Sequence, residues 1–160
     1  MLTTEQLATL KAAILADPQL AAKASGPGTD INWLAIQMNK NDASNALGWI
    51  TNQPEANSDD APDYSTFDTI QAGKRESWGF FLARPRDFTR NKVRKWVTDV
   101  WGNATAGSNS EAILLAATEK ASRAEVLFGG NTKSTGTVSA LDRAWIGEIS
   151  MQDVADALAS

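Results

Sequence analysis

Histidine and cysteine are both absent from this chain of 160 residues. Their absence excludes the usual ligands of zinc, haem and iron–sulfur clusters, and with them the Ser-His-Asp triad, thiol nucleophiles and disulfide bonds. Carboxylate chemistry, oxygen-ligated Mg²⁺ or Ca²⁺, and lysine or serine nucleophiles remain open, but no motif selects any of them. We therefore expect a protein without enzymatic activity, cofactor or bound metal.

Long hydrophobic runs are also missing from the sequence. No stretch approaches the ~20 apolar residues that a membrane-spanning helix needs, so we expect no membrane partner. The N-terminal segment 1–24 is rich in alanine and leucine, but Glu5, Lys11 and Asp17 interrupt it and no basic region precedes it. It therefore predicts a helix of the mature protein rather than a signal peptide.

Tyrosine occurs once, whereas tryptophan occurs six times. Tryptophan combines a large apolar ring with an N–H donor, which suits the edges of cores and interfaces better than an isolated ligand platform. The apolar content of 42% and the charged content of 21% are those of an ordinary globular protein. Length and composition together predict a single domain over residues 1–160.

Hydrophobic spacing and capping signatures predict a mainly α fold of about six helices. Capping boxes, in which two side chains satisfy the free N–H groups at a helix start, are indicated at Thr3-x-x-Gln6, Ser108-x-x-Glu111 and Ser150-x-x-Asp153. Further helices are expected at 43–50, at 112–128, and from Thr89 onward. The last of these carries the clearest helical stripe, formed by Val93, Trp96, Val97, Val100 and Trp101. One small C-terminal β-hairpin is expected between "TGTVSAL" and "AWIGEIS".

Two segments are expected to be flexible. The first is an acidic, proline-containing arm at 52–65, in which the order of Asp59, Asp60 and Asp63 is that of a solvated loop rather than of a calcium-binding loop. The second is the turn "GGNTKSTGTVS" at 129–139, which follows a glycine helix cap. It is not a nucleotide-binding loop, because Thr132 stands where that motif requires glycine before the lysine.

A basic segment stands out on this acidic chain, whose net charge is −4. Eight of the fifteen Lys and Arg residues lie within residues 74–95, and only two acids accompany them there. Three interpretations stay open: a solvated helix face, a contact with an acidic protein surface such as the arm of a neighbouring copy, or a contact with nucleic-acid phosphates. The residues that we predict to make a protein or DNA contact are Arg84, Arg86, Arg90, Arg94 and Lys95.

Three stretches resemble a family of small, uncharacterised virion-morphogenesis proteins of tailed bacteriophages. They are "LTTEQLATLKAAILADPQLAA" at Leu2–Ala22, "NKVRKWVTDVWGN" at Asn91–Asn103, and "ASRAEVLFGGNTKSTGTVSALDRAWIGEISMQDV" at Ala121–Val154. The resemblance covers about half of the chain and carries no information about chemistry.

What the resemblance implies is a structural role in the virion, after assembly in the host cytoplasm. The expected role is a head–tail connector (adaptor or neck) component that forms a homo-oligomeric ring and docks on portal and tail proteins. The basic residues would then face an acidic neighbour or the packaged DNA in the lumen, and the arm with Asp59, Asp60 and Asp63 would become ordered on assembly. The alternatives are tail completion, capsid decoration, or a small regulatory protein that binds nucleic acid through its basic helix.

Overall fold

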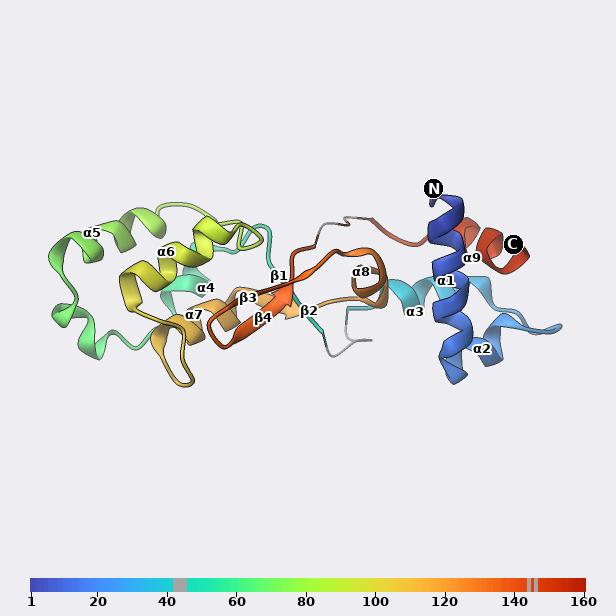
Figure 1. Cartoon of the computed structure of the whole chain (residues 1–160), viewed down its shortest axis with the longest axis horizontal. Helices are drawn as coiled ribbons and strands as arrows, with labels where there is room; N and C mark the ends of the chain where they lie inside the picture. The colour runs from blue at the N-terminus through green and yellow to red at the C-terminus, as the bar shows by residue number, and fades with distance from the viewer. Residues whose placement is uncertain (42–45, 144, 146) are drawn as a thin grey trace. The chain divides into compact units, whose positions relative to one another are not determined.

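The structure, a computed structural model, describes residues 1–41, 46–143, 145 and 147–160 (Figure 1). The chain divides into two compact units. Unit 1 comprises Met1–Asn45, Lys120–Gly130 and Ala144–Ser160, and unit 2 comprises Ala46–Glu119 and Asn131–Arg143. Each unit has its own hydrophobic core. The expectation of one domain over residues 1–160 stays a prediction.

Unit 1 is built from helices. They are α1 (Thr4–Ala16), α2 (Pro18–Ala24), α3 (Ile31–Asn39), α8 (Arg123–Phe128) and α9 (Met151–Ala159). The predicted capping box at the start of α1 is confirmed, because Thr3 Oγ1 accepts from the Gln6 amide and Gln6 Oε1 accepts from the Thr3 amide at 2.9 Å. These reciprocal bonds satisfy donors that a helix start otherwise leaves free.

The core of unit 1 lies where α1, α3, α8 and α9 meet. Its fully buried side chains include Leu10 and Ile14 on α1, Leu34 on α3, and Val154 on α9. Leu10 and Ile14 are four residues apart, as are Val154 and the partly buried Leu158, so one stripe of each helix faces the core. A polar tie adds to this packing, since Asn39 bonds both the amide and the carbonyl of Ile149, each at 2.8 Å.

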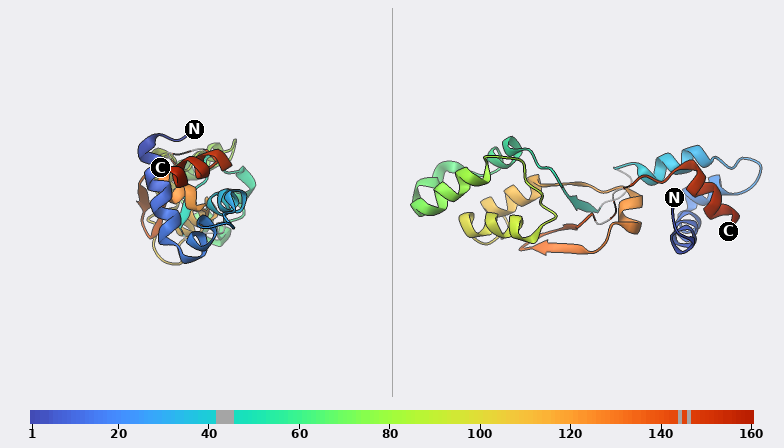
Figure 2. Two further views of the ribbon diagram at one scale, coloured as in Figure 1. Left: turned by 90° about the vertical axis from the view of Figure 1, so that its right-hand side faces the viewer. Right: turned by 90° about the horizontal axis from the view of Figure 1, so that it is seen from above.

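Unit 2 combines helices with a sheet. Its elements are β1 (Leu47–Trp49), α4 (Glu55–Asp59), the 3₁₀ helix η1 (Tyr64–Thr69), α5 (Ala72–Phe81), α6 (Asn91–Trp101), α7 (Asn109–Ala116), β2 (Thr118–Lys120, which ends in unit 1), β3 (Thr132–Thr135) and β4 (Val138–Leu141). The strand order is β2-β1-β4-β3, with β1 parallel and β3 antiparallel to β4. The helices α5, α6 and α7 gather at one end of this sheet (Figures 1 and 2).

The predicted mainly α fold of about six helices is wrong. In the part of the chain that the structure describes there are ten helices and a mixed sheet of four strands, which is an α/β fold with 55% helix. The sequence pattern does not reveal β1, β2 and β3, because each is only three or four residues long, whereas β4 lies within the expected strand segment "TGTVSAL". Alternation of apolar and polar residues needs a longer run than this to stand out.

Two of the expected helices are also wrong. The single helix over 112–128 is in fact α7, β2 and α8, because Ser122 and Glu125 form a capping box that starts a new helix at Arg123. In the expected helix at 43–50, residues 43–45 lie outside the described residues, and Leu47–Trp49 form the strand β1.

The C-terminal hairpin exists, but its strands differ from the expected pair. Thr132–Thr135 pairs with Val138–Leu141, so most of the turn expected at 129–139 is regular structure. Of the expected second strand, 144 and 146 lie outside the described residues, and the others are not in a strand. Gly136 opens the two-residue turn with a φ of 61°, and a Cβ there would meet the Ala104 carbonyl oxygen. Glycine at this position is what a tight type II′ turn requires.

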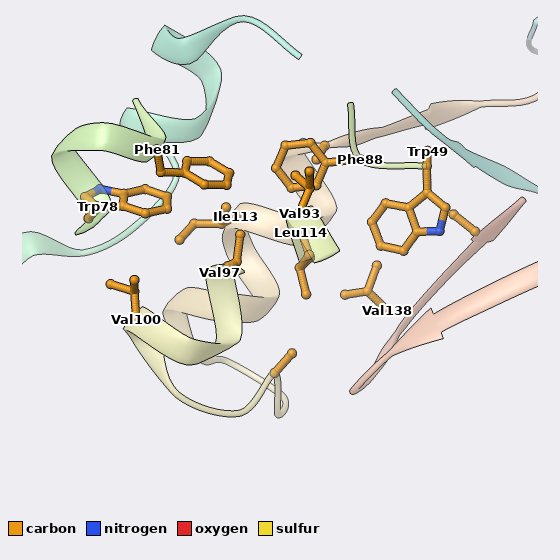
Figure 3. Close-up of a cluster of buried hydrophobic side chains, with 13 residues drawn as sticks. Trp49, Trp78, Phe81, Phe88, Val93, Val97, Val100, Ile113, Leu114 and Val138 are labelled. Atoms are coloured by element: carbon orange, nitrogen blue, oxygen red, sulfur yellow. The ribbon is translucent and has the colours of Figure 1, made fainter. Parts of the chain in front are cut away.

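The core of unit 2 is rich in aromatic rings (Figure 3). Trp78 and Phe81 on α5 stack with their centroids 4.7 Å apart, and Phe81 meets the Phe88 and Trp96 rings edge-on at 6.0 and 5.3 Å. The apolar stripe predicted on α6 points into the same cluster, where Val97 is fully buried. Aromatic pairs in these geometries add about 0.5–1.5 kcal/mol each beyond their buried area.

Asp153 on α9 ties the chain start to the C-terminal helix. Its carboxylate accepts from the amides of Leu2 and Ser150, each at 3.0 Å, and from the Ser150 hydroxyl. Burial raises the pKa of Asp153, but the hydrogen bonds from Ser150 and Leu2 outweigh it, and the pKa lies below its usual value. The charged form is therefore the one that the fold stabilises.

We expect Asp153→Asn to lower the free energy of unfolding at neutral pH by about 1 kcal/mol, because a neutral amide replaces a charged acceptor. The folded pKa is lower than the unfolded one, so the stabilisation is complete above about pH 5 and is lost as the pH falls through the folded pKa. Urea unfolding followed by circular dichroism should show the variant and the unaltered protein converge in acid. Asp156→Asn, one turn along α9, is the control and should change little. Equal stability at neutral pH would contradict the prediction.

Candidate functional site

The predicted contact residues Arg84, Arg86, Arg90, Arg94 and Lys95 all lie in unit 2, in the loop between α5 and α6 and on α6. The structure does not place them on one exposed face. Arg84, Arg90 and Lys95 are exposed, whereas Arg86 and Arg94 are buried with 8% and 2% of their surface accessible. Arg94 is therefore not part of a solvated face of α6, and Arg86 in the preceding loop is not exposed either.

Arg86 closes the C-terminal end of α5. Its Nε donates to the Phe81 carbonyl at 2.7 Å, and its Nη2 donates to the Phe80 carbonyl. The guanidinium lies over the rings of Phe81 and Trp96, at 5.1 and 4.9 Å from their centroids. A cation at this position satisfies carbonyls that the helix end leaves free and complements the negative end of the helix dipole.

Arg94, on the first turn of α6, holds the loop that precedes this helix. Its Nη1 donates to the carbonyls of Phe88 and Thr89, its Nε donates to Thr135 Oγ1 at 3.1 Å, and its guanidinium lies 4.9 Å from the centroid of the Trp49 ring. Arg94 therefore links α6, the preceding loop and strand β3. The helical pattern of α6 alone predicts an exposed Arg94. In the structure Arg94 is buried, because the β3–β4 hairpin covers this side of the helix.

Burial lowers the pKa of both buried guanidinium groups. For Arg86 the nearby charge of Arg84 lowers it further, while for Arg94 the charges of Asp142 and Asp87 partly offset the effect. A guanidinium stays protonated in proteins, so both remain cations. Arg86 therefore carries its charge beside a second cation, and it makes no ion pair with any residue that the structure describes.

A groove of about 600 Å³ opens beside α6. It is lined by Arg84, Pro85, Arg86, Asp87, Arg90, Lys92, Val93, Trp96 and Asp99. Trp96 forms part of its apolar lining, and its Nε1 donates to Ser77 Oγ on α5 at 2.7 Å, which fixes the ring. We call this site the basic groove.

The charges of the basic groove are only partly balanced within the chain. Arg90 pairs with Asp87 at 2.8 Å, and Lys95 beside the groove pairs with Asp99 at 2.6 Å. Arg84 and Lys92 are exposed and make no ion pair with any described residue. The groove thus presents cationic side chains to an incoming group, together with two carboxylates and an aromatic wall.

Asp87 keeps its negative charge in this groove. Burial raises its pKa, but hydrogen bonds from Thr89 and Arg90 lower it more, and the result is a pKa below the usual value. The Thr89 amide donates to Asp87 Oδ1 at 3.1 Å. A ligand made only of anionic groups would therefore meet repulsion as well as attraction here.

The acids of the predicted assembly arm lie in a structured segment. Residues 52–65, where a flexible arm is expected, contain α4 and the start of η1, and the flexibility of the segment stays a prediction. Asp63 caps η1 by accepting from the Ser65 amide at 2.8 Å, and its own backbone is held by the side chain of Asn109. The physical reason is that polar side chains of the segment satisfy its backbone locally and against α7.

Asp59 and Asp60 end α4 and are exposed. Asp59 accepts a hydrogen bond from the Tyr64 hydroxyl, which in turn accepts from Trp78 Nε1 at 2.9 Å. Burial, and after it the hydrogen bond to Asp59, raises the pKa of Tyr64 to about 12. Whether Asp59, Asp60 and Asp63 serve assembly stays a prediction.

Neither a metal cluster nor a membrane helix is found in the described part of the chain. No three His, Cys, Asp or Glu side chains there are grouped as metal ligands, and none of the helices there has the length and apolar character needed to span a bilayer. No protein-family model, curated protein or solved structure matches the chain.

The sequence predicts the cations of the groove but not the groove, whose apolar lining comes from residues that were not candidate site residues. Pro85 and Trp96 form its apolar lining, and neither was singled out as a site residue. One signal was present, because aromatic residues stand on both sides of Arg86, at positions 81, 88 and 96. A cation among core aromatics indicates stacking rather than a solvated charge.

Arg94→Met is expected to lower the free energy of unfolding by about 2–4 kcal/mol, because it leaves the buried carbonyls of Phe88 and Thr89 without a donor. Lys95→Met is the matched control, since it removes the adjacent cation from an exposed pair and should cost less than about 1 kcal/mol. Urea unfolding followed by tryptophan fluorescence measures both. Equal effects of the two substitutions would contradict the structural role of Arg94.

Tyr64, the single tyrosine, should titrate with a midpoint of about 12 in the folded protein and about 10 in the unfolded chain. Because folding raises this pKa, its contribution to stability is complete below about pH 10 and is lost as the pH rises through 12. Tyrosinate absorbance after a rapid pH jump, read before unfolding, gives the folded midpoint. Asp59→Asn should lower it, and a midpoint near 10 in the folded protein would exclude the hydrogen bond from Tyr64 to Asp59.

Proposed function

We propose that this protein is a non-enzymatic structural component of a tailed-bacteriophage virion, acting as a head–tail connector subunit. The observation that carries the docking role is the basic groove, where Arg84 and Lys92 are exposed and without an ion pair among the described residues. The place in the virion rests on the resemblance of residues 2–22, 91–103 and 121–154 to phage morphogenesis proteins.

The composition of the groove favours a protein partner over nucleic acid. A surface that binds a phosphate backbone places Lys and Arg along it and keeps carboxylates away. Here Asp87 and Asp99 line the same groove as the cations, and Arg86 and Arg94 are occupied by backbone carbonyls. An acidic segment of a protein partner, with apolar side chains for Trp96 and Val93, fits this mixture better.

Tail completion and capsid decoration use the same kind of docking surface, so the position in the particle separates them from a connector. In a connector, the subunit forms a ring around the axis between head and tail, and each groove meets the same neighbour. In a decoration protein, the copies are spread over the capsid.

Mass spectrometry of purified virions should detect the protein in a copy number that fits one ring per particle, and electron microscopy should place it between portal and tail. Arg84→Glu with Lys92→Glu should lower the yield of infective particles at least about tenfold, because reversed charges repel an acidic partner. Lys23→Glu with Lys74→Glu makes the same net change at exposed positions outside the groove and should leave the yield unchanged. Absence of the protein from virions would refute the proposed function.

A further inference from the structure

We propose that the occupant of the basic groove is the acidic surface of α4 in a second copy of this chain. The inference rests on the proposed function, since it names the contact that joins neighbouring subunits of the ring. Both surfaces lie in unit 2, so the contact needs nothing from unit 1.

The groove needs a partner that brings carboxylates. Arg84 and Lys92 are exposed at its wall, and the charge of Arg84 lies close enough to Arg86 to disfavour the protonated state of that guanidinium. Arg86 uses Nε and Nη2 for the carbonyls at the end of α5, and its Nη1 makes no hydrogen bond to any described residue. A carboxylate placed between these cations would relieve their repulsion and accept from more than one of them.

The same chain carries a complementary surface. Residues 41–73 contain no Lys or Arg but six acids, whereas residues 74–95 contain eight Lys and Arg and two acids. The net charges of the two segments are therefore −6 and +6. Opposite charge separated into neighbouring segments is a pattern that steers copies of one protein toward each other.

The acids of this surface stand on a short, anchored helix. Glu55 opens α4 and Asp60 caps it, and both side chains are exposed and make no ion pair with any described residue. Ser58 within α4 is buried, and α4 packs against α7. The helix therefore presents its carboxylates outward on a fixed backbone, which reduces the entropy lost on binding.

The contact joins two copies rather than two parts of one chain. Gln53 and Arg86 exchange backbone hydrogen bonds of 2.8 and 3.1 Å, which fixes the start of α4 relative to the loop of the groove. In this arrangement no residue of α4 lines the groove of its own chain. The groove and α4 are different surfaces, so a contact between them adds copies in one direction, and a ring forms where the rotation closes.

The test is self-association of the purified full-length protein, measured by analytical ultracentrifugation. The unaltered protein should associate in about 50 mM salt and at least about tenfold more weakly in about 500 mM salt, because the paired charges are screened. Arg84→Glu with Lys92→Glu should abolish association, and so should Glu55→Lys with Asp60→Lys. Lys23→Glu with Lys74→Glu should associate as the unaltered protein does.

Mixing the two charge-reversed variants is the decisive measurement, since each brings the surface that the other lacks. The mixture should associate, although neither variant does so alone. All three double variants change exposed side chains, and circular dichroism checks that each is folded. An unaltered protein that stays monomeric, a mixture that fails to associate, or a groove that instead binds an oligonucleotide through Arg84 and Lys92 would overturn the inference. None of these outcomes bears on whether the protein is found in the virion, which tests the proposed function separately.

Discussion

The burial of two guanidinium groups is the constraint on which the architecture of unit 2 depends. Arg86 holds the last carbonyls of α5, and Arg94 holds the carbonyls of the loop before α6. These two arginines fix the backbone of the loop 82–90, which has little regular structure of its own. The groove beside α6 depends on this loop, because loop residues form part of its lining. Burying a cation is costly unless its donors are satisfied, and here carbonyls, a threonine hydroxyl and aromatic faces satisfy them in place of a carboxylate.

The parts of the fold that the sequence predicts are those in which the signal is local. The helix starts at Thr3 and Ser150 follow from side chains three residues apart, and the structure has both capping boxes. The sheet depends on contacts between segments far apart in the chain, such as the parallel pairing of Gly48 with Leu141. A strand of three residues contains no period to detect, so its pairing partners, which supply its hydrogen bonds, have to be known first.

The candidate site was predictable in charge but not in burial. The cluster of cations at 74–95 is plain in the sequence, and the exposed members Arg84, Arg90 and Lys95 are where a solvated surface was expected. Arg94 lies one turn before Val97 on α6. It is buried because the β3–β4 hairpin, through Thr135, covers this side of the helix. Whether a charged side chain at the border of an apolar stripe is buried or exposed therefore depends on the element that packs against the helix. A helical pattern alone does not identify that element.

This division between buried and exposed cations bears on what the groove recognises. Arg94 is committed to backbone carbonyls and to Thr135, and Arg86 has only its Nη1 left, so fewer cations are free to meet a ligand than the sequence indicates. A phosphate backbone needs many such contacts for affinity, because each contributes mainly through counterion release. A short acidic helix needs only a few, provided that they are placed to match its carboxylates and that an apolar surface accompanies them. The groove has few free cations, two acids and the fixed ring of Trp96. This combination suits a short acidic helix better than a phosphate backbone.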